Sequence, residues 1–265
     1  MLGMLAAARR YRYFILSSIK TEFRAKFVRS RLGGLWMILN PLLQVLIFAF
    51  VLSSLLSAHL PGIDSRYAYT IYLMAGILGW SLFSEILFRC LTLFIDNGNI
   101  IKKLAFPKIA LPLIVIGSAL INNVLLLAAI LMIFGVLGHW PGATLVWLPV
   151  LTAINIALAL GLGLILGVLN VFMRDVGQVV PVVVMQLLYW FTPIVYMVEI
   201  IPQRFRGWMV LNPLIPVITS YQNVLLYNRP PDWAGLGVPV LIAAALLAFA
   251  LLLFRKATPE IVDQL

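Results

Sequence analysis

The sequence predicts an all-α integral membrane protein with six transmembrane helices, and three observations lead to that fold class. Hydrophobic residues make up 63% of the 265 residues and charged residues only 11%, whereas soluble domains are about 45–50% apolar. Mean hydropathy is +1.06. Six long apolar stretches follow a basic N-terminal segment, and a helix needs about 20 apolar residues to cross a bilayer. We therefore expect residues 1–265 to form a single transmembrane domain without a separate soluble one.

The distribution of basic residues predicts how the spans are oriented. We place the spans at residues 35–57, 67–89, 109–137, 147–172, 177–198 and 236–254. Fifteen of the nineteen Lys and Arg residues then fall in the N-terminal segment, around the connections after the second and fourth spans, or in the C-terminal tail. Because cytoplasmic loops are rich in Lys and Arg, both termini are predicted to be cytoplasmic. The net charge of +10 then needs no nucleic acid as a partner.

Residues 11–31 have the pattern of an amphipathic interface helix. At 100° per residue one apolar stripe contains Leu16, Ile19, Phe23 and Phe27. Basic residues flank this stripe, namely Lys20, Arg24, Lys26 and Arg31. Such a helix lies among the lipid headgroups with its apolar stripe sunk and its basic side chains reaching lipid phosphate. It either serves as a simple anchor or also braces a cytoplasmic partner.

Residues 96–106 form a second short helix in the predicted cytoplasmic connection. Asp96 or Asn97 is placed to cap it, and Pro107 ends it. Its apolar face would contain Ile100, Ile101 and Leu104, beside the lysines Lys102 and Lys103. This face either lies on lipid or fits a groove in a soluble partner.

The connection before the last span, residues 199–235, is apolar yet interrupted by Pro213 and Pro216. Its apolar pieces are too short to cross a bilayer. We expect short re-entrant helices in the outer leaflet, which require that their backbone ends bind protein or water.

The sequence offers no candidate for catalysis or for a metal or cofactor site. The phosphate-binding pattern GxxxxGK[ST] is absent, and the single cysteine, Cys90, has no partner. Glycines at 161–167 indicate helix packing instead, because Ala159, Gly163 and Gly167 recur every four residues. We expect this small-residue stretch to let two helices approach each other closely. Glu85 and Arg89, four residues apart, predict an ion pair on one face of the second span.

Two further features have a structural and a functional interpretation. Arg174 and Asp175 occupy a tight turn between the fourth and fifth spans, as a capping pair or as a contact point for a partner. Aromatic residues cluster around the helix breaker Thr192–Pro193, namely Tyr189, Trp190, Phe191 and Tyr196. They form either an interfacial belt or a flat surface on which sugar rings slide.

Several ordered motifs resemble the ABC-2-type polysaccharide exporter permeases. The segment Arg29–Trp36 with Asn40–Pro41–Leu42 is similar to the start of that family, and Lys102–Lys103 with Phe106–Pro107 and Leu111–Pro112 is similar to its first coupling loop. Arg174–Asp175, Thr192–Pro193–Ile194, Tyr196 and Asn212–Pro213–Leu214 follow in the same order. The similarity covers about residues 20–230.

The resemblance implies the ABC-2 (type V) exporter fold and a homodimer that binds two copies of a separate ATPase, which holds ATP and Mg. It implies export of lipid-linked polysaccharide (O-antigen, capsule or teichoic acid) across the bacterial inner membrane. Residues 96–106 would be the coupling helix and the Arg174 turn the second contact. The partner-coupling residues would be Asn97, Asn99, Ile100, Ile101, Lys102, Lys103, Leu104, Phe106, Arg174 and Asp175. The conduit would be lined by Trp36, Asn40, Tyr189, Trp190, Phe191 and Tyr196.

Three alternatives differ in observable ways. A drug or small-lipid efflux permease is disfavoured because the large outer domain of some such relatives is absent. A membrane-embedded transferase needs a His/Asp/Glu cluster at the membrane surface, and the sequence shows none. A scaffold subunit is distinguished from a transporter by an adjacent gene encoding GxxxxGK[ST], which favours the transporter.

Overall fold

The computed structural model describes residues 10–28, 33, 35–48, 50, 67–103, 109–198, 201–202, 204, 207, 209 and 211–264. These residues form helices and connections, with no strand among them. The longer helices are α2 (Arg12–Val28), α3 (Trp36–Phe48), α4 (Ala68–Asp96), α6 (Ala110–Val136), α7 (Leu148–Phe172), α11 (Leu214–Leu225) and α12 (Trp233–Gln264). The shorter ones are α5 (Gly98–Lys103), the 3-10 helix η2 (Ala143–Trp147), α8 (Val176–Val182), the π-helix η3 (Val183–Leu188) and α9 (Tyr189–Phe191).

Four of the six predicted spans are long, apolar helices in the part of the chain that the structure describes. They are Ala68–Asp96, Ala110–Val136, Ala143–Phe172 and Trp233–Ala257. Two of them run past the predicted ends, since α4 continues seven residues beyond the predicted residue 89 and α12 continues to Gln264. Their length and composition confirm an integral membrane protein.

The first and fifth predicted spans coincide with shorter apolar helices, Ile38–Ile47 and Val176–Phe191. The predicted end of the first span, residues 51–57, lies outside the described residues. The prediction that the fifth helix continues to residue 198 was wrong. Thr192 has an extended backbone, and Pro193 restricts the residue before it to such a conformation. Within this helix, Pro181 removes a hydrogen-bond donor, and a π-turn follows it.

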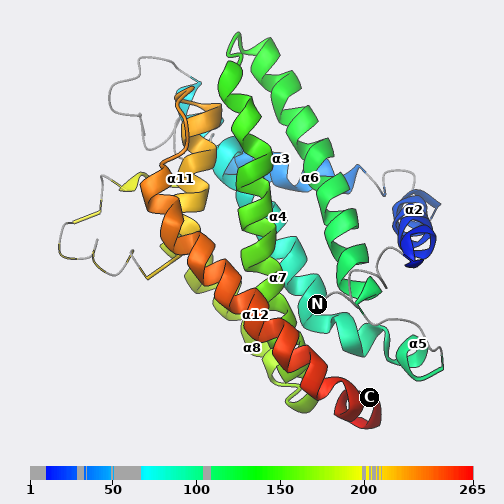
Figure 1. Cartoon of the computed structure of the whole chain (residues 1–265). Coiled ribbons are helices and arrows are strands. Elements are labelled where there is room, and N and C mark those ends of the chain that lie inside the picture. The colour runs from blue at the N-terminus through cyan, green and yellow to red at the C-terminus, as the bar shows by residue number, and fades with distance from the viewer. Residues whose placement is uncertain are drawn as a thin grey trace.

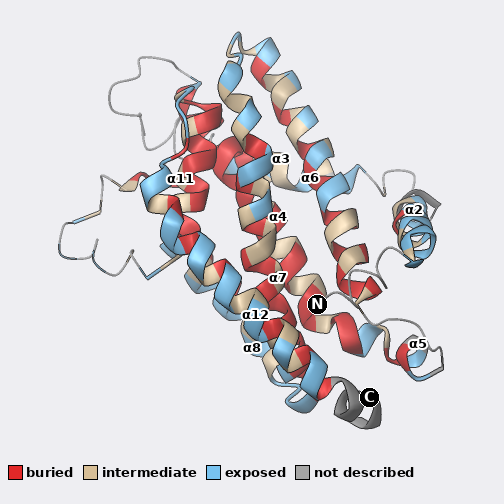
Figure 2. Ribbon diagram, in the orientation of Figure 1, coloured by how far each residue is buried: buried red, intermediate tan, exposed pale blue. Residues whose placement is uncertain are grey.

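Helix α4 is the centre of the bundle, since it packs against α3, α6, α7 and α11. Buried residues line it along most of its length, whereas the outer side of α12 is largely exposed (Figure 2). Asparagine side chains also bond to its backbone carbonyls. Asn123 donates to Leu78 over 3.0 Å, Asn155 to Gly79 over 2.7 Å and Asn170 to Leu91 over 2.9 Å.

The small residues of α7 pack against other helices of the same chain. A Cβ atom on Gly163 would lie 2.7 Å from Cβ of Cys90 on α4, and one on Gly161 would lie 2.8 Å from Cβ of Leu246 on α12. A Cβ atom on Gly167 would lie still closer to the backbone carbonyl of Cys90. The close helix approach was predicted correctly, but its partners are α4 and α12.

The bundle has two distinct ends (Figure 1). Helix α5, the α7–α8 turn and the C-terminal end of α12 lie at one end, and α11 lies with the α6–α7 connection toward the other. Helix α2 lies beside the bundle and packs against α6. The two ends are called the α5 end and the α11 end below.

Candidate functional site at the two ends of helix α4

The α5 end contains a cluster of charged and polar side chains from three helices. Glu22 of α2 accepts from Arg89 of α4 over 2.7 Å and from Ser118 of α6 over 2.6 Å. Glu85 lies 3.9 Å from Arg89 and accepts from Asn122 over 2.5 Å. The predicted Glu85–Arg89 pair is therefore the longer of two contacts to Arg89. The closer partner, Glu22, comes from a helix that the sequence placed in the lipid headgroups.

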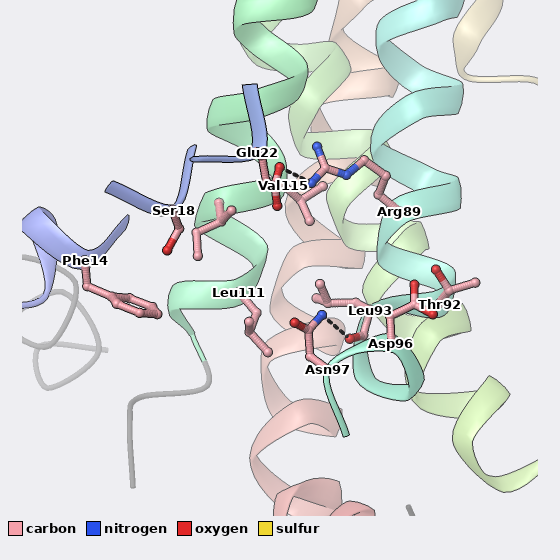
Figure 3. A pocket seen from close by; sticks show the side chains of 11 residues that line it. Phe14, Ser18, Glu22, Arg89, Thr92, Leu93, Asp96, Asn97, Leu111 and Val115 are labelled. Atoms are coloured by element: carbon pink, nitrogen blue, oxygen red, sulfur yellow. Dashed lines mark hydrogen bonds and ion pairs between the residues drawn. The ribbon is translucent and has the colours of Figure 1, made fainter. Parts of the chain in front are cut away.

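A cavity of about 320 Å³ lies beside this cluster, between α2, the end of α4 and the start of α6 (Figure 3). Its polar wall consists of Ser18, Glu22, Arg89, Thr92, Asp96 and Asn97, and its apolar wall of Phe14, Leu93, Leu111, Ile114 and Val115. Because Asp96 and Asn97 immediately precede α5, the cavity connects the α2 contact with the predicted coupling helix.

Helix α5 turns one of its apolar residues into the bundle, which corrects the predicted docking face. Ile101 is only 5% exposed and belongs to the main core, whereas Asn99 and Lys102 are exposed. Asn97 directly precedes α5: its carbonyl accepts from the Ile101 amide over 2.9 Å, and its side-chain amide donates to the Leu93 carbonyl at the end of α4 over 2.8 Å. The side chains of Ile100 and Lys103, and all of Leu104 and Phe106, lie outside the described residues.

The turn between α7 and α8 presents both of its charged residues. Arg174 and Asp175 are exposed. The Asp175 carbonyl accepts from the backbone of Gln178 over 3.0 Å and of Val179 over 2.9 Å, but its side chain makes no capping hydrogen bond. The backbone thus starts α8 by itself, and both side chains face outward from the α5 end.

At the α11 end, α4 holds the non-helical segment that follows α9. Tyr72 donates to the carbonyl of Pro193 over 3.0 Å and to that of Tyr196 over 2.9 Å. Tyr69 donates to the carbonyl of Val195 over 2.5 Å, and Gln222 of α11 donates to Pro193 over 2.9 Å. Carbonyls without helical partners are costly at membrane depth unless protein groups bind them. Together these side chains form a tyrosine clamp, here defined as Tyr69, Tyr72 and Gln222.

The sequence model of the ABC-2 type transporter family matches residues 13–226. The match begins in α2, ends just after α11 and so includes both sites on α4. This chain belongs to the ABC-2 type transporter family.

Three similar proteins align with this chain over most of their lengths. The ABC-2 chain is 28% identical to the O-antigen export system permease protein RfbA of Myxococcus xanthus over 100% of both chains. It is 27% identical to a Klebsiella pneumoniae protein of the same name, over 89% of this chain and 88% of the relative. It is 24% identical to the polysialic acid transport protein KpsM of Escherichia coli, over 88% of this chain and 89% of the relative.

The predicted conduit residues of the ABC-2 chain divide into exposed and buried groups. Trp36 is 50% exposed, Trp190 49% and Phe191 57%, and Asn40 is also exposed. Tyr189 is buried, with its ring 5.2 Å from that of Trp80. Gln44 of α3 donates to the Tyr189 hydroxyl over 3.2 Å, so the structure brings the two predicted conduit helices together. Tyr196 is half-buried and donates to the Trp190 carbonyl over 2.5 Å.

The interface helix of the ABC-2 chain contacts protein more than was predicted. Ile19, placed in the lipid-facing stripe by the sequence, is buried against Gly117 of α6. Phe23 is half-buried and Arg24 exposed, while Arg31 and the side chain of Phe27 lie outside the described residues.

The sequence interpretation missed Glu22 and the tyrosine clamp. Glu22 carries a signal, since it is the only acidic residue among the first 63. An isolated acid in a basic amphipathic helix indicates a specific partner, because lipid phosphate repels it. Tyr69 and Tyr72 carry no comparable signal, since tyrosines at a helix end are ordinarily interpreted as an interfacial belt.

Proposed function

We propose that this chain is the transmembrane permease subunit of an ATP-driven exporter that moves lipid-linked polysaccharide, most favourably O-antigen, across the bacterial inner membrane. The supporting observation is the alignment over the full length of an O-antigen export permease. Membership of the ABC-2 family is consistent with a membrane subunit that carries cargo and performs no chemistry on it.

The physical problem is to move a long hydroxyl-rich chain through about 30 Å of hydrocarbon. Each unsatisfied polar group costs several kcal/mol there, on the order given for transfer to an apolar medium. The cargo therefore needs a lined, hydrated route, which two copies of this chain facing each other would supply. The exposed Trp36, Asn40, Trp190 and Phe191 are the best candidates for its surface, with Tyr189 supporting them from behind.

Energy must come from a partner, because the chain lacks a phosphate-binding loop. Two copies of a separate ATPase would bind ATP and Mg, and their closure would push on the α5 end. The exposed side chains there, Asn99, Lys102, Arg174 and Asp175, are the candidates for the contact. Ile101 and Asn97 instead join α5 to the bundle, so that a push on α5 reaches α4.

This proposal fixes the orientation. The α5 end would face the cytoplasm together with both termini, in agreement with the excess of Lys and Arg. The first and fifth helices would complete six crossings. Helix α11, with only 12 residues, would be a re-entrant helix of the outer leaflet, where Asn212 accepts from the Leu214 amide over 3.0 Å and so satisfies the helix start.

Capsular polysaccharide is the second candidate cargo, since one relative is a polysialic acid transport protein. The identity and coverage are lower than for the O-antigen permease of Myxococcus xanthus. The higher identity and coverage support O-antigen as the first candidate cargo.

The test is deletion of the gene followed by analysis of undecaprenyl-linked glycan and surface glycan. We expect lipid-linked glycan to accumulate inside the cell while surface glycan is lost, with both reversed by the gene on a plasmid. A plasmid carrying the Lys102→Asp variant is the matched comparison. This variant should fold, but it should neither clear the accumulated lipid-linked glycan nor restore surface glycan. A normal surface coat without accumulation would contradict glycan export.

A further inference from the structure

Glu22 is the only acidic residue among the first 63, and one of its oxygens joins three helices. Oε2 lies 2.7 Å from an Arg89 nitrogen on α4 and 2.6 Å from the Ser118 hydroxyl on α6. The Glu22 side chain is 39% exposed and that of Arg89 28%. Partial burial strengthens such charge-assisted hydrogen bonds relative to a fully solvated pair.

An apolar contact lies directly beside this charged one. Ile19 precedes Glu22 by nearly one helical turn, and Gly117 precedes Ser118. Ile19 packs so closely on Gly117 that a side chain at that position would collide with it. The contacts that hold helix α2 against α6 therefore include an apolar pair and a hydrogen bond to a carboxylate, which a helix held only by lipid would not need.

The Glu22–Arg89 pair also lines the cavity at this end of α4. Figure 3 shows Glu22 and Arg89 at one side of it and Asp96 and Asn97, which precede α5, at the other. Among the described residues, this cavity of about 320 Å³ separates α2 from the end of α4. The Glu22–Arg89 pair bridges α2 and α4 beside this cavity, so it is a candidate link between the movements of the two helices.

We propose that Glu22 is a positioning residue that fastens the interface helix to α4 and α6, so that a displacement of α5 moves α2 with the bundle. The inference rests on the proposed export function, in which a partner ATPase displaces α5. Glu22 acts through Arg89 and Ser118 and touches no cargo. The cavity gives the end of α4 room to move while the fastening holds.

The first test measures the position of α2 without any cargo. Cysteines replace Ile19 and Gly117 in a chain carrying Cys90→Ala, and membranes containing the full-length protein are treated with a mild oxidant. We expect efficient disulfide formation with Glu22 present and a several-fold loss with Glu22→Ala. Lys20→Ala is the matched control, because Lys20 is an exposed charge on the same helix, and it should leave the yield unchanged. Equal yields for Glu22→Ala and its parent would overturn the inference.

The second test measures export in the otherwise unchanged chain. Glu22→Ala and Arg89→Ala should each reduce surface glycan about tenfold, and the double variant should be no worse than either, because both remove the same pair. Glu22→Gln, which keeps a hydrogen-bond acceptor, should restore part of the export. Loss of the disulfide with normal export would overturn the coupling role. If the parent chain exports no glycan, the export proposal fails, while the disulfide comparison still decides whether Glu22 fastens α2.

Discussion

The two ends of helix α4 use opposite means to hold a neighbouring segment. At the α5 end, Arg89 holds α2 by a half-exposed ion pair beside a cavity. At the α11 end, Tyr69 and Tyr72 hold the segment after α9 by neutral hydrogen bonds from buried side chains. A partly exposed ion pair tolerates small shifts of its two helices at modest cost, whereas buried carbonyls that lose their donors incur the full desolvation penalty.

The difference indicates which end moves. The α5 end combines charge, a cavity and exposed Asn99 and Lys102, all of which permit rearrangement when a partner binds. At the α11 end, Tyr69, Tyr72 and Gln222 bind the carbonyls of the segment after α9, which favours one fixed arrangement. A helix of 29 residues spans about 43 Å at 1.5 Å per residue, so α4 connects the charged, cavity-lined α5 end with the hydrogen-bonded α11 end. The predictions below test this contrast.

The largest expected effect separates the two faces of α5. Ile101→Asp should destabilise the fold by about 3–5 kcal/mol, because it removes buried apolar surface and buries an unpaired carboxylate. Lys102→Asp, one residue later and exposed, should leave stability within about 0.5 kcal/mol but weaken association with the ATPase about tenfold. Thermal unfolding in detergent and co-purification of the ATPase measure the two effects. Equal stability losses would mean that α5 lies on the bundle with both faces.

The next effect measures the tyrosine clamp. Tyr72→Phe removes one hydroxyl that serves two carbonyls, and we expect a loss of about 1–3 kcal/mol. Tyr69→Phe removes a donor to one carbonyl and should cost about half as much. Thermal unfolding midpoints of the two variants give the comparison. A smaller loss for Tyr72→Phe than for Tyr69→Phe would show that the segment after α9 finds other donors.

The long, regular elements were predictable from the sequence. The third and fourth predicted spans, residues 109–137 and 147–172, agree with α6 and α7 within a few residues. Continuous apolar runs of this length are typical of membrane helices. The close approach at Gly163 followed from residue size alone. The partner of that approach did not, because spacing along one helix carries no information about which neighbour fills the groove.

The site was less predictable, because its contacts join residues far apart in the sequence. Glu85 was chosen for Arg89 since helical spacing makes i, i+4 pairs visible, yet the closer partner is 67 residues away. Ile101 was assigned to a docking face because the sequence of this six-residue helix shows which of its sides is apolar. The sequence does not show which part of the protein or of a partner covers that side. The aromatic cluster was identified correctly as a group, while the burial of Tyr189 depends on Trp80, which no local pattern connects with it.

A smaller effect on stability with a clear effect on export is expected for the exposed aromatic surface. Trp190→Ala should lower the unfolding midpoint less than truncation of a buried tryptophan, since about half of Trp190 is already exposed, while export falls several-fold if sugar rings contact it. Trp80→Ala is the matched control, because the same residue type is buried there and its loss should cost about 3–5 kcal/mol. Normal export by Trp190→Ala would place the conduit on another face.

The smallest effect is expected at the α7–α8 turn. It decides whether the ATPase would contact the α5 end at one place, α5, or at two, α5 and this turn. Arg174→Ala should not alter stability, because the backbone alone starts α8 and the side chain is exposed. We expect ATPase association to weaken about two- to threefold, the scale of a single solvent-exposed charge contact. Combined with Lys102→Asp, the losses should multiply, since separate contacts contribute additively to the free energy. If the double variant binds no worse than Lys102→Asp alone, the ATPase contacts α5 only, and the whole displacement must enter through the cavity-lined end of α4.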